Sequence, residues 1–337
     1  MSSGAASDRN TVSPRRTVGA KKLAILAAKL VVTGACFWYI ARKIDLSQIW
    51  STIPRLDFRW AALAVVLIML QIPLVGLRWR NIVDALGSCD WQMTRAAMIA
   101  ITAIGAFFNQ VLPAVAGDGV RSWLLVRSGC DWRNAIASVV IDRVVGVGVL
   151  LAMGFAILQL PSRLAALGGY RWLVLGVYGA LLLGGIVGLS LTPWLVPTLE
   201  RSRYSRWIAI LASDARRILI GPKGPTVLGL ACLVQLLTIA AIWSLGRAQG
   251  LMLPATDAAM LYTVMLGVAL VPISIGGWGL RELALISILG AHGIAAEQAL
   301  LFSICFGLTL AVGALPGAVV WLLYSVPPAL RSAERSS

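Results

Sequence analysis

Two apolar stretches of the chain, far apart in sequence, are interrupted in nearly the same way: residues 112–121 are LPAVAGDGVR and residues 271–282 are VPISIGGWGLRE. Each block has a proline, then a glycine-rich turn, then Gly-x-Arg. Proline removes a helical hydrogen-bond donor and glycine frees the backbone, so each block predicts an interrupted membrane helix. Irregular backbone and charged groups are tolerated at membrane depth only inside the protein or beside a water-filled cavity. The two blocks therefore predict a polar intramembrane site of the kind that transporters build.

The composition places the chain among helical membrane proteins. Its 337 residues are 59% hydrophobic and only 13% charged, and several apolar runs reach about 20 residues, the length that crosses a bilayer core. We expect an all-α polytopic integral membrane protein with about six full transmembrane helices and two broken or re-entrant helical hairpins, an arrangement that allows an inverted repeat. The full spans are predicted at residues 23–41, 60–77, 134–160, 172–192, 226–246 and 299–326, and the broken segments at 96–128 and 258–291.

The predicted membrane domain covers residues 23–326 and lies between two tails. Residues 1–22 are polar and basic, which predicts a disordered cytosolic tail, and residues 327–337 predict a short cytosolic tail. The net charge of +15 falls largely in short loops between spans, where lysine and arginine orient a membrane protein. We therefore expect no nucleic-acid partner.

Most soluble-enzyme chemistry lacks its usual side chains here. His292 is the only histidine, which argues against histidine-based zinc sites and Ser-His-Asp catalysis. The five cysteines are scattered without a CxxC pair, so we expect neither a disulfide framework nor a metal site. The Gly-Gly-Trp-Gly turn at 276–279 lacks the spacing and the lysine of a Walker loop. No cofactor is expected.

The distribution of lysine and arginine favours re-entry of both broken segments. If both segments cross the membrane, positive charge is spread about evenly over the two sides. If both re-enter, the basic loop at 201–223 shares one side with the N-terminal tail, which restores the excess of positive charge found on cytosolic faces. Both termini then lie in the cytosol and the chain in the cytoplasmic membrane. The first hairpin enters from the cytosol and the second from outside, so the two blocks would meet near the midplane.

Short helices are expected to restart after each glycine-rich turn, over residues 120–126 and 280–289. Asp118 would cap the first helix and Glu282 would lie in the first turn of the second. The unpaired N–H groups at such helix starts attract anions such as phosphate.

Arg121 and Arg281 would each need an anion nearby at membrane depth. Two interpretations stay open: the arginines bind a lipid phosphate, or Asp118–Arg121 and Arg281–Glu282 are ion pairs that lock the hairpins. The substrate-binding candidates are Asn109, Gly117, Asp118, Gly119, Arg121, Gly276, Gly277, Gly279, Arg281 and Glu282.

Asp142 and Arg143 form a further charged pair inside an otherwise apolar run. Because neighbours in sequence point in different directions on a helix, each is expected to meet a partner elsewhere. We expect them to brace the structure rather than contact substrate, although both interpretations stay open. Asn109 precedes the first proline and is expected to satisfy free backbone carbonyls of the broken helix. The structural candidates are Pro113, Asp142, Arg143, Pro272 and Ser274.

These motifs together resemble the flippase-like membrane domain of the lysylphosphatidylglycerol synthases and their stand-alone relatives. That family carries an Asn–Leu-Pro–Gly-Gly-Asp–Arg block, an Asp-Arg pair and a Pro–Ser-x-Gly-Gly-x-Gly-x-Arg-Glu block. The matching residues are Asn109, Leu112, Pro113, Gly117, Asp118, Arg121, Asp142, Arg143, Pro272, Ser274, Gly276, Gly277, Gly279, Arg281 and Glu282. Ala116 stands where the family usually has its first glycine. The soluble synthase domain has no counterpart in this sequence, so the resemblance implies lipid movement between leaflets rather than lipid aminoacylation.

The leading expectation is a translocase for an anionic phospholipid or another membrane lipid, with the head group held by Arg121, Arg281 and the two helix starts. The alternative is a non-transporting membrane partner of a lipid-modifying enzyme, such as one of a hopanoid or isoprenoid-lipid pathway. An intramembrane lipid transferase would need an acid/base pair, for which Asp118, Asp142 and Glu282 are the buried candidates.

Overall fold

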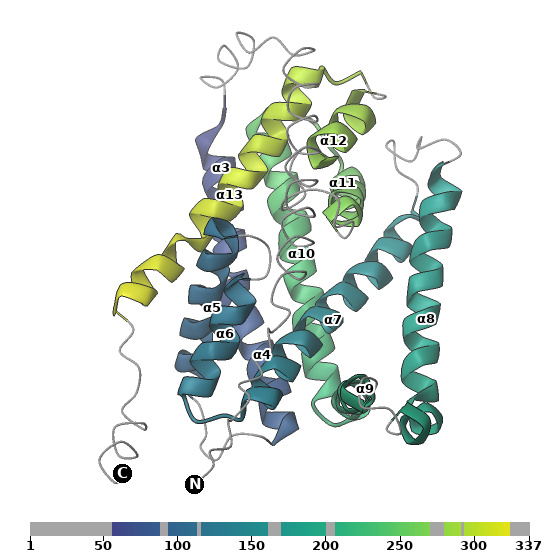
Figure 1. The fold of residues 1–337 in the computed structure, drawn as a ribbon. Coiled ribbons are helices and arrows are strands. Elements are labelled where there is room, and N and C mark those ends of the chain that lie inside the picture. Colours follow the sequence, from purple (N-terminus) through teal and green to yellow (C-terminus); the bar gives the residue numbers. More distant parts are fainter. Residues whose placement is uncertain are drawn as a thin grey trace, which may run out of the picture.

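The computed structural model describes residues 56–87, 94–112, 116–160, 170–199, 206–269, 280–290 and 293–323. Every regular element in these ranges is an α-helix (Figure 1). The helices are α3 (Phe58–Met69), α4 (Gln71–Leu86), α5 (Arg95–Val111), α6 (Ala116–Arg127), α7 (Trp132–Ile157), α8 (Tyr170–Leu199), α9 (Arg206–Ile220), α10 (Gly224–Ala248), α11 (Ala255–Ala269), α12 (Leu280–Gly290) and α13 (Ala296–Leu323). The predicted first span at 23–41 and both predicted tails lie outside the described residues.

Five described segments are long and apolar enough to cross a membrane. They are Phe58–Leu86, Trp132–Ile157, Trp172–Trp194, Gly224–Ala248 and Ala296–Leu323. They coincide with five of the predicted spans, so the all-α polytopic fold is confirmed. The first of them continues nine residues past its predicted end at residue 77, and it contains a break at Leu70. Pro73 lies in the first turn after this break, where its missing N–H costs the helix nothing.

The two broken segments form pairs of short helices. With 17, 12, 15 and 11 residues in α5, α6, α11 and α12, these helices are about 16 to 26 Å long, against the roughly 30 Å of a bilayer core. Helix α5 packs against α6, and α11 packs against α12. Figure 1 shows the first pair in the lower half of the molecule and the second in the upper half. This arrangement agrees with two hairpins that enter from opposite sides.

The order of helix lengths repeats along the chain. A long segment (Phe58–Leu86) is followed by short α5 and α6 and long α7, and long α10 is followed by short α11 and α12 and long α13. In both units the second short helix packs against the long helix that follows it. Together with the opposite placement of the hairpins, this order fits an inverted structural repeat.

Helix α6 begins earlier than its glycines suggested. It starts at Ala116 rather than at residue 120, so Asp118 lies in its first turn and is not its N-cap. Gly117 brings α6 close to α5: a Cβ on Gly117 would collide with the carbonyl oxygen of Gly105, and a Cβ on Gly105 would collide with the Arg121 side chain. From the sequence, Gly117 was interpreted as part of a flexible turn. In the structure its missing side chain instead allows α5 and α6 to approach closely. The predicted start of α12 at residue 280 and the position of Glu282 in its first turn are confirmed.

Replacing Gly117 by Ala is expected to lower the free energy of unfolding by about 1–3 kcal/mol, because the added methyl group meets backbone that can move only with the whole helix. Gly119→Ala is the matched control, since Gly119 lies two residues along the same helix with open space around its Cβ position. That variant should gain about 0.5–1 kcal/mol from helix propensity. Thermal unfolding of the two purified variants in detergent measures both shifts. Equal shifts of the same sign would contradict the described contact of α5 with α6.

The prediction of no disulfide is wrong at Cys130. This residue is disulfide-bonded, and its partner lies outside the described residues. Cys232 and Cys305 are free thiols. A sequence shows local motifs such as CxxC, whereas a disulfide needs only that two cysteines come close in the fold.

Candidate functional site

Asp142, in the middle of α7, joins three helices through its carboxylate. One oxygen, Oδ1, accepts a hydrogen bond from Nε of Arg78 on α4 at 2.8 Å, and the other, Oδ2, accepts one from Nη2 of Arg121 on α6 at 3.2 Å. The residue is only 1% exposed. A carboxylate and two guanidinium groups can share such an interior only if each is paired, so these contacts fix how α4, α6 and α7 pack.

Asp118 is the second carboxylate of this cluster. It accepts two hydrogen bonds from Arg143 on α7, from Nε at 2.8 Å and from Nη2 at 3.0 Å. Its Oδ1 also lies 3.6 Å from Nη1 of Arg121. The charges thus alternate along one chain of contacts, Arg78–Asp142–Arg121–Asp118–Arg143, which we call the arginine–aspartate network. As expected, Asp142 and Arg143 each find partners other than one another.

The network carries one positive charge more than its carboxylates neutralise, because it holds three arginines and two aspartates. Arg78 and Arg121 are buried, whereas the side chain of Arg143 is 54% exposed. Two N–H groups of Arg143 bind Asp118, and its other N–H groups have no partner among the described residues. The surplus charge therefore lies at the accessible end of the network.

Arg121 is buried and packs against an aromatic ring as well as the two carboxylates. Its guanidinium lies over the ring of Trp79, 4.2 Å from the ring centroid, in a cation–π contact. The Trp79 ring is itself fixed, because its Nε1 donates a hydrogen bond to Oγ of Ser138 at 3.1 Å. The Nε atom of Arg121 is buried without a described partner. This packing favours a bracing role for Arg121 over direct contact with a ligand.

Arg281 belongs to a separate cluster at the junction of α12 and α13. Its Nη2 lies 2.8 Å from Oε1 of Glu282, and its Nε donates a hydrogen bond to Oγ of Ser303 at 3.0 Å. The Ser303 hydroxyl in turn donates to Oε1 of Glu282 at 2.7 Å. All three residues are buried, and the arginine and glutamate balance each other in charge.

The described residues do not bring Arg121 and Arg281 into contact. Helix α6 packs against α5 and α7, whereas α12 packs against α11 and α13. The turns that would join the two blocks, 113–115 and 270–279, lie outside the described residues. The meeting of the blocks at the midplane stays a prediction.

Asn109 pairs with a backbone group at the start of α6. Its Oδ1 accepts a hydrogen bond from the backbone N–H of Gly117 at 3.2 Å. The Asn109 side chain thus pairs with a free backbone N–H group at the helix start, whereas the sequence analysis expected it to pair with free backbone carbonyls. Gly119 is exposed in the first turn of the same helix. The remaining site candidates lie outside the described residues: Pro113, Pro272, Ser274, Gly276, Gly277 and Gly279.

Comparison with known proteins agrees with this architecture. The family model described as the lysylphosphatidylglycerol synthase TM region matches residues 26–317, most of the chain. The chain belongs to this family. It is therefore a multi-pass membrane protein of a family named for an enzyme that makes a membrane lipid, as the sequence motifs predicted.

A curated relative carries a different name. Glycosyltransferase AglD of Haloferax volcanii is 30% identical over 160 residues, which cover 47% of this chain and 24% of that protein. The aligned region thus spans about a quarter of the relative's length. In broad terms, the family match and this relative connect the chain with membrane-lipid function.

Sequence reasoning missed three residues of these clusters, namely Arg78, Trp79 and Ser303. Arg78 was missed because the span predicted at 60–77 ended one residue before it, but no proline or glycine interrupts the chain again before Gly87. An uninterrupted helix through residue 86 would have placed Arg78 at membrane depth. Ser303 carried no signal, since serine is common inside membrane helices.

Proposed function

We propose that this protein moves an anionic phospholipid, or another anionic membrane lipid, between the leaflets of the cytoplasmic membrane. The observation that carries the proposal is the accessible surplus charge of Arg143 within the apolar span Trp132–Ile157. Both termini would lie in the cytosol, on the side that the positive-inside rule assigns to the basic loop at 201–223.

Arg143 has the position and the free donors that a head-group phosphate requires. It lies about 16 Å along α7 from Trp132, near the middle of the span. A guanidinium suits bidentate contact with phosphate, and the N–H groups that do not bind Asp118 are available for it. A phosphate there would neutralise the surplus charge of the arginine–aspartate network. This contact would offset part of the free-energy cost of desolvating the head group, which is the main barrier to crossing.

The other charged residues would hold this site in place. Asp118 orients Arg143, while Asp142, Arg78 and Arg121 fix the three helices around it. The proposal moves the main lipid contact from Arg121 and Arg281, favoured from the sequence, to Arg143. The reason is that both of those arginines are buried and occupied by protein groups.

The direct test is leaflet exchange in liposomes. Purified protein is reconstituted with head-group-labelled phosphatidylglycerol, and a membrane-impermeant reductant is added outside. We expect the label in the inner leaflet to be lost only in liposomes with protein, without added nucleotide, and more slowly for labelled phosphatidylcholine. Full protection of the inner-leaflet label in the presence of folded protein, with several anionic lipids tried, would contradict translocation.

A second candidate is a non-transporting membrane partner of a lipid-modifying enzyme. The similarity to about a quarter of a glycosyltransferase supports it, because a membrane module of this kind then occurs alongside enzymatic function. This candidate predicts normal partner binding and no exchange in the liposome assay. It also predicts that Arg143→Gln leaves partner binding unchanged.

A further inference from the structure

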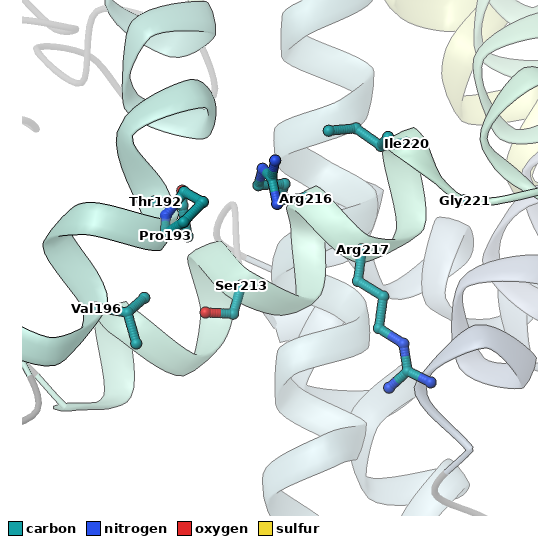
Figure 2. A pocket seen from close by; sticks show the side chains of 8 residues that line it. All are labelled: Thr192, Pro193, Val196, Ser213, Arg216, Arg217, Ile220 and Gly221. Carbon is teal, nitrogen blue, oxygen red and sulfur yellow. The ribbon is translucent and has the colours of Figure 1, made fainter.

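A cavity of about 490 Å³ lies between the C-terminal half of α8 and helix α9, away from the arginine–aspartate network. It has the size of a small-molecule site. Figure 2 shows Val196 and Ser213 facing each other between the two helices, with Arg216 on the α8 side of α9. Its lining is Thr192, Pro193, Val196, Ser213, Arg216, Arg217, Ile220 and Gly221.

The positive charge of this cavity is not neutralised by the described residues. Neither Arg216 nor Arg217 has an ion-pair partner among them, and Nε of Arg216 is buried without a hydrogen-bond partner. Lys223, only a few residues further on, does reach a carboxylate, that of Asp84 at 3.6 Å.

Helix α9 also carries an acidic residue, which lies near Arg217. Asp214 is the helix's one acidic residue. Burial raises the pKa of its carboxyl above the ordinary value, and the nearby charge of Arg217 offsets the rise only in part. Arg216 is therefore the cavity's guanidinium group with a buried donor that no described residue occupies.

Helix α9 has the character of a helix that lies in the membrane interface. It is amphipathic: Ala215 and Ile218 are buried, while the basic Arg206 and Arg217 are exposed together with Trp207. Figure 1 places it across the lower end of α8, the end toward which the α5–α6 pair lies. The span Trp172–Trp194 ends here. Exposed tryptophan and a mixed apolar and basic surface are typical of the head-group layer.

We propose that this cavity binds the phosphate of an anionic phospholipid, with Arg216 as the main contact and Arg217 beside it. Arginine donors would bind the phosphate oxygens, and Pro193, Val196 and Ile220 would line the apolar part of the molecule. The hydroxyls of Thr192 and Ser213 already donate to backbone carbonyls, so the arginines supply the donors. The inference does not depend on lipid translocation, because the two sites share no residue.

The test counts bound lipid on the purified protein. The protein is titrated with phosphatidylglycerol in detergent, and retained lipid is measured by native mass spectrometry for the wild type, Arg216→Gln and Val196→Trp. Arg206→Gln is the matched control, since it removes the same charge from the same helix outside the cavity. We expect Arg216→Gln and the cavity-filling Val196→Trp to weaken binding about tenfold, and Arg206→Gln to change it less than about twofold.

Three results would overturn the proposal. Unchanged retention by monodisperse Arg216→Gln and Val196→Trp would show that lipid binds elsewhere. An equal loss in Arg206→Gln would show attraction to basic charge in general rather than binding in the cavity. Displacement of the lipid by soluble glycerol phosphate at equal concentration would assign the site to a soluble phosphate compound instead of a lipid. Arg143→Gln should retain the lipid at this site, whatever its effect on leaflet exchange.

Discussion

Asp142→Asn is expected to lower the free energy of unfolding by about 3–5 kcal/mol, the usual cost of removing one partner from a buried ion pair. The variant keeps the shape of the side chain but removes its charge, so Arg78 loses its one described carboxylate. Arg121 keeps only the longer contact with Asp118 at 3.6 Å. Chemical or thermal unfolding in detergent, with the wild type alongside, measures the loss.

Asp84→Asn is the control for this prediction. Asp84 is 41% exposed and lies 3.6 Å from both Arg80 and Lys223, and exposed pairs of this kind contribute about 0–1 kcal/mol. The double variant Asp142→Asn with Arg78→Met should recover part of the stability, because it removes one of the uncompensated buried charges. An effect of Asp142→Asn no larger than that of Asp84→Asn would contradict the described network.

The fold could be predicted because its signals are local. Hydrophobic runs set the spans, and proline and glycine set the breaks: the span predicted at 226–246 is found at Gly224–Ala248. The predicted span that ended too early, at residue 77, failed for a local reason as well. The helix continues to Leu86, and Arg78, just past the predicted end, is paired inside the protein.

The pairing of the charges could not be predicted, because it depends on how helices rotate against one another. Arg78 and Asp142 are 64 residues apart, and no spacing rule connects them. The carboxylate nearest to Arg121 in sequence, Asp118, lies farther from it at 3.6 Å than Asp142 does at 3.2 Å. Exposure is a property of the fold too, so nothing in the sequence distinguished the accessible Arg143 from the buried Arg121.

The arginines of the two repeat-like units have different contacts. In the second unit, the described contacts of buried Arg281 are with Glu282 beside it and Ser303 on α13, and they pair one positive with one negative charge. In the first unit, Arg121 meets Asp142 on α7, and the added arginines leave a surplus positive charge. A neutral cluster stabilises a hairpin without attracting an anion, whereas a surplus charge attracts one. The asymmetry supports a ligand site in the first unit and a structural contact in the second.

Arg143→Gln is expected to slow leaflet exchange of anionic lipid about 10- to 100-fold, the range that corresponds to one lost hydrogen bond to a charged group. The free energy of unfolding should fall less than in Asp142→Asn, although Asp118 loses its two shorter hydrogen bonds. The Arg143 side chain is half exposed, Asp118 keeps its contact with Arg121, and the remaining two arginines and two aspartates balance. The expected pattern is thus the opposite of that for Asp142→Asn, which would disturb folding first. Exchange rate and melting temperature, measured on the same preparation, separate the two effects.

Arg133→Gln is the matched control for Arg143→Gln, because Arg133 is exposed near the start of the same helix and lies outside the network. It should leave the exchange rate within about twofold of the wild type, a difference below about 0.4 kcal/mol.

Arg143→Lys should slow exchange to an intermediate degree, since it keeps the charge but loses the planar donors that bind phosphate in pairs. If Lys and Gln at residue 143 slow exchange equally, paired hydrogen bonding matters and charge alone does not. If folded Arg143→Gln exchanges lipid as fast as the wild type, Arg143 does not bind the head group, and the surplus charge serves the structure alone.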